Sequence, residues 1–146
     1  MMKMISIIAI ALLASIGMSC NLPRDTRDSF DYAKSHALKV GVVDNPPFSR
    51  YDSDSIRGTE IKMIEEFAQK EGLEVEFIPG SESSLVERMK EAEIHVLVGG
   101  FEKKTVWKEK TGKTRPYDGK HIWLIPKGEN KLVYKLESYL HTIKKP

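Results

Sequence analysis

The sequence has few of the residues that disulfide, metal or nucleic-acid chemistry requires. Its single cysteine, Cys20, excludes an internal disulfide and a cysteine metal cluster within the chain. The four histidines are scattered and have no metal-ligand spacing. The formal net charge of +2 in 146 residues is too small to favour binding to a nucleic acid. No serine lies in a nucleophile turn. The sequence therefore predicts no cofactor, no metal and no nucleic-acid partner.

The first twenty residues have the pattern of an export signal. Lys3 precedes an apolar run from Met4 to Met18, which is somewhat short for a membrane-spanning helix and is followed by small residues. Gly17-Met18-Ser19-Cys20 resembles a bacterial lipobox, in which the cysteine becomes the lipid-modified first residue. We expect residues 1–20 to be a signal peptide of the lipoprotein type, with Cys20 as the lipid attachment site. A plain cleaved signal and an uncleaved anchor are the alternatives, and each predicts an exported protein in the periplasm or at the cell surface.

Residues 21–37 are polar and alternate in charge, with few apolar side chains. Such a segment buries too little surface to order itself, so we expect a flexible tether. The sequence does not decide whether Phe30 and Tyr32 dock on the domain that follows. That domain is predicted to comprise residues 38–146.

Residues 38–146 alternate between strand and helix patterns, which is typical of an α/β domain. Leu38–Val43 is a short apolar run that ends at Asp44-Asn45-Pro46-Pro47, as expected of a strand buried on both faces. Further strands are predicted over 73–78, 94–98 and 121–125, the last as an edge strand because Pro126 ends it. Helices are predicted over 59–71, from Ser84 and from Asn130 to the C-terminus, with a short helix or irregular turn in 102–112.

These lengths predict one mostly parallel sheet between two helical layers. Right-handed crossovers give a strand order of second, first and third, to which the edge strand and the C-terminal helix are added. The chain leaves the first and third strands in different directions, so their carboxyl ends form a topological switch point. We therefore expect residues 44–48 and 99–102 to form the two lips of one crevice.

The candidate ligand contacts are residues at or near this crevice. Phe48 and Trp107 could form an aromatic sandwich, or each could cover the core. Gly99-Gly100 could present backbone amides, or form a plain turn. Arg115 could bind an anionic group, or be solvated. The full set of expected ligand contacts is Asp44, Pro47, Phe48, Glu60, Gly99, Gly100, Phe101, Glu102, Trp107 and Arg115.

Seven basic residues lie between Lys103 and Lys120. A run of like charge is usually a solvated face, and contact with an acidic partner or with the membrane surface is the alternative. His95 lies inside a predicted strand and is expected to be a buried histidine of the core.

Four segments resemble the family-3, amino-acid-type substrate-binding proteins of ABC importers, which have the type II periplasmic solute-binding fold. The segments are Leu38–Phe48, Gly58–Phe67, Glu91–Gly100 and Arg115-Pro116-Tyr117, in one register. The resemblance implies a non-enzymatic, exported protein that binds a small polar solute and presents it to an ABC permease or another membrane protein.

Two departures from the family pattern qualify this function. The chain after Tyr117 is too short for the family's second lobe, so we expect a three-layer single lobe that binds weakly alone. A second protein or a homodimer would complete the pocket. Trp107 falls where the family has a carboxylate-binding arginine, and an indole cannot form that bidentate pair, which weighs against an amino-acid ligand.

Two other functions stay open from the sequence. The first is a membrane-tethered sensory or adaptor module that contacts a partner protein through Phe48, Trp107 and the basic run. The second is a small dehydratase-like enzyme that uses Glu60 or Glu102, because the same fold hosts enzymes.

Overall fold

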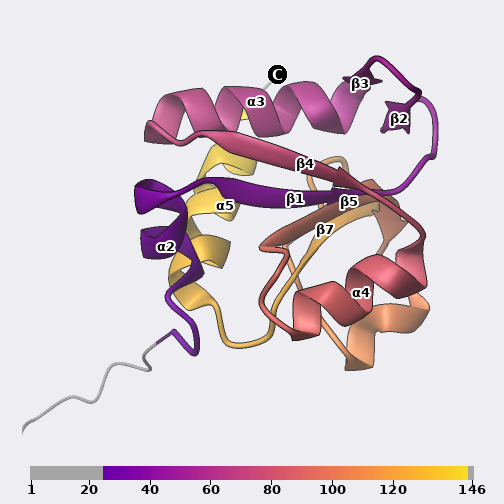
Figure 1. Ribbon diagram of the computed structural model, residues 1–146. Coiled ribbons are helices and arrows are strands. Elements are labelled where there is room, and N and C mark those ends of the chain that lie inside the picture. The colour runs from indigo at the N-terminus through magenta and orange to yellow at the C-terminus, as the bar shows by residue number, and fades with distance from the viewer. Residues whose placement is uncertain (1–24, 145–146) are drawn as a thin grey trace, which may run out of the picture.

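The computed structural model describes residues 25–144 (Figure 1). The predicted signal peptide and Cys20 lie outside the described residues. Within the described part of the chain, each helix is too short or too polar to cross a bilayer.

A five-stranded sheet forms the centre of the molecule, in the order β4-β1-β5-β7-β6. The parallel strands are β4 (Val75–Pro79), β1 (Leu38–Val42) and β5 (Val96–Glu102), which confirms the predicted order of second, first and third. Strand β7 (His121–Ile125) runs antiparallel to β5. The two-residue strand β6 (Gly112–Lys113) pairs with the outer side of β7, so β7 is not the edge that Pro126 suggested. A separate hairpin joins β2 (Arg50–Tyr51) and β3 (Ile56–Arg57).

Four α-helices and one 3-10 helix accompany the described sheet. They are α2 (Ser29–Ser35), α3 (Thr59–Glu71), α4 (Glu82–Lys90), η2 (Val106–Glu109) and α5 (Asn130–Ile143). Helix α3 has its predicted bounds and ends at Gly72, which adopts the left-handed conformation that suits glycine. Helix α4 begins before the predicted capping box, because Ser81 and not Ser84 is its cap and accepts a hydrogen bond from the Ser84 amide.

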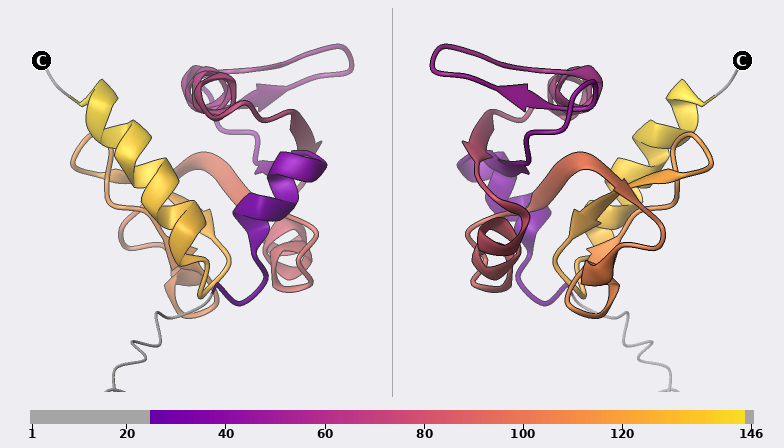
Figure 2. Two further views of the ribbon diagram at one scale, coloured as in Figure 1. Left: turned by 90° about the vertical axis from the view of Figure 1, so that its left-hand side faces the viewer. Right: turned by 90° about the vertical axis from the view of Figure 1, so that its right-hand side faces the viewer.

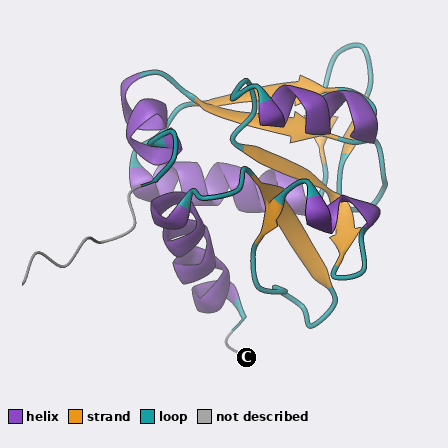
Figure 3. Cartoon of the chain, turned by 90° about the horizontal axis from the view of Figure 1, so that it is seen from below, coloured by secondary structure: helices purple, strands orange, loops and turns teal. Residues whose placement is uncertain are grey.

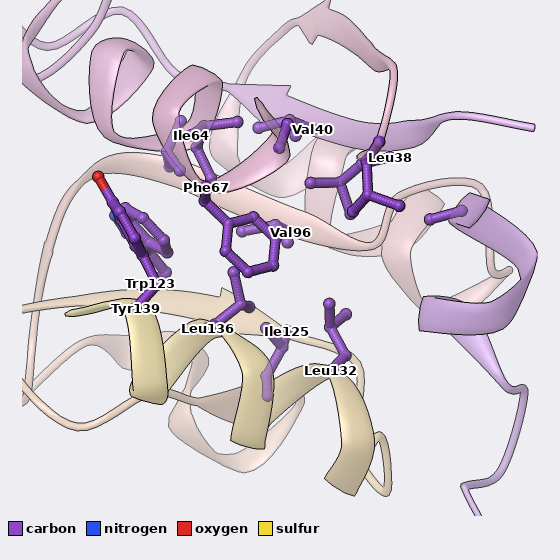
Figure 4. Packing of buried hydrophobic residues seen from close by; sticks show 14 of the residues in the cluster. Leu38, Val40, Ile64, Phe67, Val96, Trp123, Ile125, Leu132, Leu136 and Tyr139 are labelled. Atoms are coloured by element: carbon purple, nitrogen blue, oxygen red, sulfur yellow. The ribbon is translucent and has the colours of Figure 1, made fainter. Parts of the chain in front are cut away.

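The strands alternate their side chains between two apolar clusters, one on each face of the sheet. In β7, Trp123 and Ile125 point to the larger cluster, while Ile122 and Leu124 point to the smaller one. Helices α2, α3 and α5 close the larger cluster (Figure 4), and α4 closes the smaller one. Helices therefore lie on both sides of the sheet (Figures 2 and 3). The predicted three-layer α/β architecture is therefore confirmed.

Residues 25–37 are packed against the domain, so the predicted flexible tether is wrong for this part of the segment. Phe30 is 0% exposed and lies in the larger cluster with Ala33. The buried carboxylate of Glu129 accepts hydrogen bonds from the backbone amides of Arg27 and Ser29, at 2.8 and 2.9 Å. Two apolar residues three positions apart are enough to dock one short helix, a signal that the surrounding polar residues concealed.

Candidate functional site

The loop after β1 lies directly against the end of β5. The side-chain amide of Asn45 donates a hydrogen bond to the Gly99 carbonyl at 2.7 Å. The Val43 amide donates to the Val98 carbonyl at 3.1 Å, and the hydroxyl of buried Ser49 donates to the Val43 carbonyl at 2.6 Å. The switch-point argument therefore correctly brought these two segments together, and hydrogen bonds join them directly.

The ring of Phe48 is seated on Gly100. A β-carbon at position 100 would lie 2.4 Å from the Cδ2 atom of Phe48, and Gly100 has a positive φ of 68°. Only glycine accommodates both the close approach and this backbone conformation. The centroid of the His121 ring lies 4.5 Å from that of Phe48. Phe48 remains half-buried, and residues 44–47 beside it are exposed.

Glu60, in the first turn of α3, lies behind the two glycines against which the Phe48 loop packs, and it is 0% exposed. Its Oε2 atom accepts hydrogen bonds from the amides of Gly99 and Gly100 at 2.7 and 3.0 Å. Its Oε1 atom accepts one from the Tyr117 hydroxyl at 2.6 Å. Burial raises the pKa of the Glu60 carboxyl, against these hydrogen bonds, which lower it. Burial and the neighbouring Glu60 also raise the pKa of Tyr117.

The first turn of α3 fixes the other side of the loop. The Thr59 amide donates to the Pro47 carbonyl at 3.0 Å, and the Glu60 amide donates to the Phe48 carbonyl at 2.9 Å. The free amides of a helix amino terminus are thus satisfied by the loop. Glu60 therefore connects the loop, β5 and the turn at Tyr117.

The structure does not place Glu60 as a ligand contact or a catalytic carboxylate, because it is buried with both oxygens engaged. Glu102, its predicted companion, is exposed and pairs with Lys120 at 2.9 Å. The two carboxylates hold different partners and form no pair. The carboxylate pair that an enzyme could have used is therefore not formed.

The predicted sandwich of Phe48 and Trp107 is not formed, because the two rings belong to different parts of the fold. Trp107 packs on the smaller apolar cluster, and its Nε1–H donates to Glu82 at 2.8 Å. Phe101 is buried in the same cluster at 6% exposure. Its side chain is therefore directed into the core and away from a ligand at the loop.

Arg115 contacts helix α5. Its amide donates to Glu137 at 2.8 Å, its guanidinium lies 3.6 Å from the same carboxylate, and its side chain is 89% exposed. Arg115 lines a hollow of about 560 Å³ along α5. Pro47 lines a second hollow, of about 440 Å³, beside β3 and the start of α3. Of the predicted contacts, Asp44, Pro47, Phe48, Gly99 and Gly100 are grouped around the loop.

Sequence reasoning missed His121 as a neighbour of Phe48 and Tyr117 as the partner of Glu60. His121 begins β7 and pairs with Glu102 in the antiparallel ladder, so its ring arrives at the end of β5. Asp118 lies 2.5 Å from the His121 Nδ1 atom. Burial would raise the pKa of Asp118, but hydrogen bonds from the His121 amide, the His121 ring and the Lys120 amide together lower it to about 2. His121 could have been placed beside Phe48 only if the antiparallel pairing of β7 with β5 had been recognised, because this pairing brings the start of β7 to the end of β5.

The arrangement presents one aromatic face with polar groups around it, and no described histidine or acidic residues gather as metal ligands. The ring of Phe48 is supported from behind and partly open in front, and Asp44 is exposed beside it. Such a surface can bind a small polar molecule by ring contact and hydrogen bonding, and its support is in place before any ligand arrives.

One solved structure with a similar fold is described as a single domain of its protein. Domain 1 from TmArgBP, solved as a Phe57Trp mutant in its arginine-bound form, is 24% identical with a TM-score of 0.73. The match covers 80% of this chain and 98% of that one. The ancestral amino-acid-binding protein AncCDT-1, a precursor of cyclohexadienyl dehydratase, is 14% identical with a TM-score of 0.71, covering 83% of this chain and 94% of that one. At these identities the likeness shows the fold.

A curated relative is longer than this chain. Membrane-bound lytic murein transglycosylase F from Idiomarina loihiensis is 25% identical over 116 residues, which are 78% of this chain. The chain spans only about a quarter of that protein's length, 26%.

The sequence model of the bacterial extracellular solute-binding proteins, family 3, matches residues 38–145. This range contains the whole sheet, the loop after β1 and the Glu60 network. The chain therefore belongs to family 3 of the bacterial extracellular solute-binding proteins, and its described residues form a lobe of the type II periplasmic fold.

Proposed function

We propose that this chain is the solute-binding component of an ABC-type transporter and that its solute contacts the half-exposed ring of Phe48. The observation that carries the proposal is the seat of this ring on Gly100, where a buried carboxylate secures the glycine amides from behind. The ring lies at the carboxyl ends of β1 and β5, where open α/β sheets bind ligands. The fold already holds the Phe48 ring in place, so little conformational entropy is lost at this ring when a solute binds.

The proposed solute is a small polar molecule of amino-acid size. Domain 1 from TmArgBP is described as bound to arginine, and an ancestral arginine-binding protein is described as bound to glutamine. Asp44 and Phe48 together suit a cationic side chain, because a carboxylate attracts the charge and an aromatic face binds it by a cation–π contact. Trp107 stands where the family has an arginine, and its indole is committed to Glu82. We therefore expect weak recognition of an α-carboxylate from this lobe.

The described lobe binds on one side only, which limits its affinity. Ligand pockets of proteins bury most of the surface of a bound small molecule, and a single open edge buries less. We propose that a second protein, or a second copy of this chain, covers the exposed side of the solute. Binding rather than catalysis is the proposed activity, because the buried Glu60 has both oxygens occupied by the fold.

We also propose that the protein is exported and held at the membrane by a lipid on Cys20. Membership in an extracellular solute-binding family supports export. The membrane partner would then be an ABC permease that receives the solute. Radiolabelled fatty acid should enter the protein in cells and should be absent from Cys20→Ser, whereas equal labelling of both forms would exclude this attachment site.

The proposed site is tested by calorimetric titration of the protein with single amino acids. We expect weak binding that favours arginine over glutamine and is lost in Phe48→Ala. The matched control is Tyr134→Ala, which removes an exposed aromatic ring from α5. Equal binding by Phe48→Ala and by the unaltered protein would refute the proposed site. Tight binding of an amino acid by the monomer would refute the argument that a single open lobe binds weakly. Native mass spectrometry of the same samples identifies the monomer or dimer.

A further inference from the structure

The loop from Lys103 to Lys113 carries charge and apolar surface that the proposed solute site does not use. It contains five lysines and a single acidic residue, Glu109. Among the described residues, only one of these lysines has an ion-pair partner, Lys110 with Glu87 at 3.7 Å. Val106 at its tip is 80% exposed, and Trp107 is half-buried. A loop of lysines around an exposed valine and an accessible indole combines charge with apolar surface in one place.

The start of the described chain is linked to this loop through Lys127 and Gly128. The Thr26 amide donates to the Gly128 carbonyl at 3.3 Å, and the adjacent Lys127 ammonium donates to the Glu109 carbonyl at the end of η2. In Figures 1 and 2 the indigo start of the described chain and the orange loop both lie on the lower side of the molecule, and Figure 1 shows them towards opposite ends of that side. The Arg27 guanidinium also donates to the carbonyls of Met89 and Lys90 at the end of α4. Residues 25–28 and the loop 103–113 therefore belong to one surface, which we call the basal face.

We propose that the basal face binds the anionic phospholipid headgroups of the membrane to which the protein is attached. The inference rests on the lipid attachment at Cys20 proposed above. Four residues lie between Cys20 and Asp25, and the five steps of chain that join these two can span at most about 18 Å, so the basal face is held near the bilayer. Lysines near an anionic surface are attracted to it, and Val106 and Trp107 can enter the headgroup region as interfacial residues do.

The acidic residues of the basal face, Asp25, Asp28 and Glu109, do not cancel the charge of its five lysines and Arg27. Glu87 is shared by Lys90 at 2.8 Å and Lys110, so one carboxylate faces two ammonium groups. Glu109 is exposed among the neighbouring lysines. Because the attachment keeps the domain at the membrane, weak attractions from several lysines act at high effective concentration. Docking through the basal face does not use the Phe48 ring, which packs on Gly100 and His121.

The test is quenching of tryptophan fluorescence by brominated lipid, with the full-length protein in vesicles. Trp107 lies on the basal face, whereas Trp123 is fully buried and supplies a constant background. Vesicles of phosphatidylcholine are compared with vesicles that also contain phosphatidylserine, and co-flotation with the vesicles reports attachment separately. The variants are Lys104→Gln with Lys108→Gln, and the matched control is Lys62→Gln with Lys70→Gln on α3.

We expect quenching only with phosphatidylserine, its loss at high salt, and its absence in Trp107→Phe. The Lys104 and Lys108 pair should reduce the docking constant about five-fold per lysine removed, and the α3 pair should not change it. Flotation without quenching overturns the proposed binding of the basal face to the membrane, and it leaves the proposed lipid attachment at Cys20 intact. A protein that does not float with the vesicles refutes the lipid attachment at Cys20. Quenching of Trp107 by an excess of phosphatidylserine vesicles then still tests whether the basal face binds anionic lipid. Equal quenching without phosphatidylserine, or none with it, overturns the proposal, and the latter outcome favours an acidic protein as the partner.

Discussion

Removal of the Glu60 carboxylate should destabilise the protein more than any other single polar substitution around the site. In Glu60→Ala the amides of Gly99 and Gly100 and the Tyr117 hydroxyl lose their common acceptor. An orphaned buried donor costs about 1–3 kcal/mol. Gly99 is buried, whereas Gly100 and Tyr117 are half-buried and can be partly satisfied by water. We therefore expect a loss of about 4 kcal/mol, a large part of the stability of about 5–15 kcal/mol that is usual for a domain.

Glu60→Gln separates the hydrogen bonds from the charge. The glutamine oxygen can accept from both glycine amides, and its NH₂ group can donate to the Tyr117 oxygen, so we expect a loss of only about 1 kcal/mol. Tyr117→Phe, which removes one donor alone, should cost about 1–2 kcal/mol. Urea unfolding, followed by circular dichroism, gives these values from the shift in midpoint at constant slope.

The pH dependence of the stability of Glu60→Gln, compared with that of the unaltered protein, shows in which direction burial shifts the pKa of Glu60. Burial raises the folded-state pKa of Glu60 above its unfolded value, so the protonated form is the one that folding favours. The contribution of Glu60 to stability is fully present below the unfolded pKa and is lost as the pH rises through the folded pKa. Glu60→Gln cannot lose it, so its stability relative to the unaltered protein should improve from pH 4 towards neutrality. A cost below about 1 kcal/mol for Glu60→Ala, or equal costs for Ala and Gln, would refute the network.

Three further changes test other contacts. His95 accepts a hydrogen bond from the Lys39 amide at 3.1 Å through Nδ1, and burial together with the charge of Lys39 lowers the pKa of His95 to about 4, from 6.5. Protonation of His95 should therefore remove at most about 3 kcal/mol of unfolding free energy as the pH falls from 6.5 to 4. His95→Asn, which keeps a hydrogen-bond acceptor, should lack this loss. If the unfolding free energies of both proteins fall equally with pH, this prediction is contradicted. Phe30→Ala should cost about 3 kcal/mol by leaving a cavity under α2, and faster amide exchange confined to residues 29–35 would identify its origin, whereas an unchanged urea midpoint would exclude docking of this helix. Gly100→Ala should cost about 2 kcal/mol or more, because its φ is positive and its methyl group would displace Phe48; a neutral effect on urea unfolding would contradict the ring's position.

The sequence was sufficient to predict the elements whose signals are local. The apolar stripe at helical spacing and Gly72 define α3, and the apolar run of Leu38–Val42 with its Pro-rich end defines β1. Chain direction and crossover handedness then place Phe48 near Gly100, because parallel strands end at the same edge of a sheet. These predictions succeed because each depends on periodicity, on turn residues or on a topological rule.

The contacts that decide the chemistry of the site were not predictable in the same way. The partners of Glu60 lie 39 to 57 positions away in the sequence, and nothing in its local pattern distinguishes a buried carboxylate from an exposed one. Trp107 was expected near Phe48 because both follow strands, yet its packing on the smaller cluster depends on which face of the sheet α4 covers. Phe30 was expected in a tether because the polarity around it outweighed a two-residue apolar signal.

The most direct test of the proposed function is a nitrogen-15 NMR titration of the protein with arginine. If the solute binds beside Phe48, amide shifts should concentrate at residues 44, 45, 48, 49, 99–102 and 121, because Pro46 and Pro47 have no amide proton. The corresponding titration of Phe48→Ala should leave these amides unchanged. Shifts concentrated along the hollow between Arg115 and α5, with the Phe48 loop undisturbed, would contradict the account.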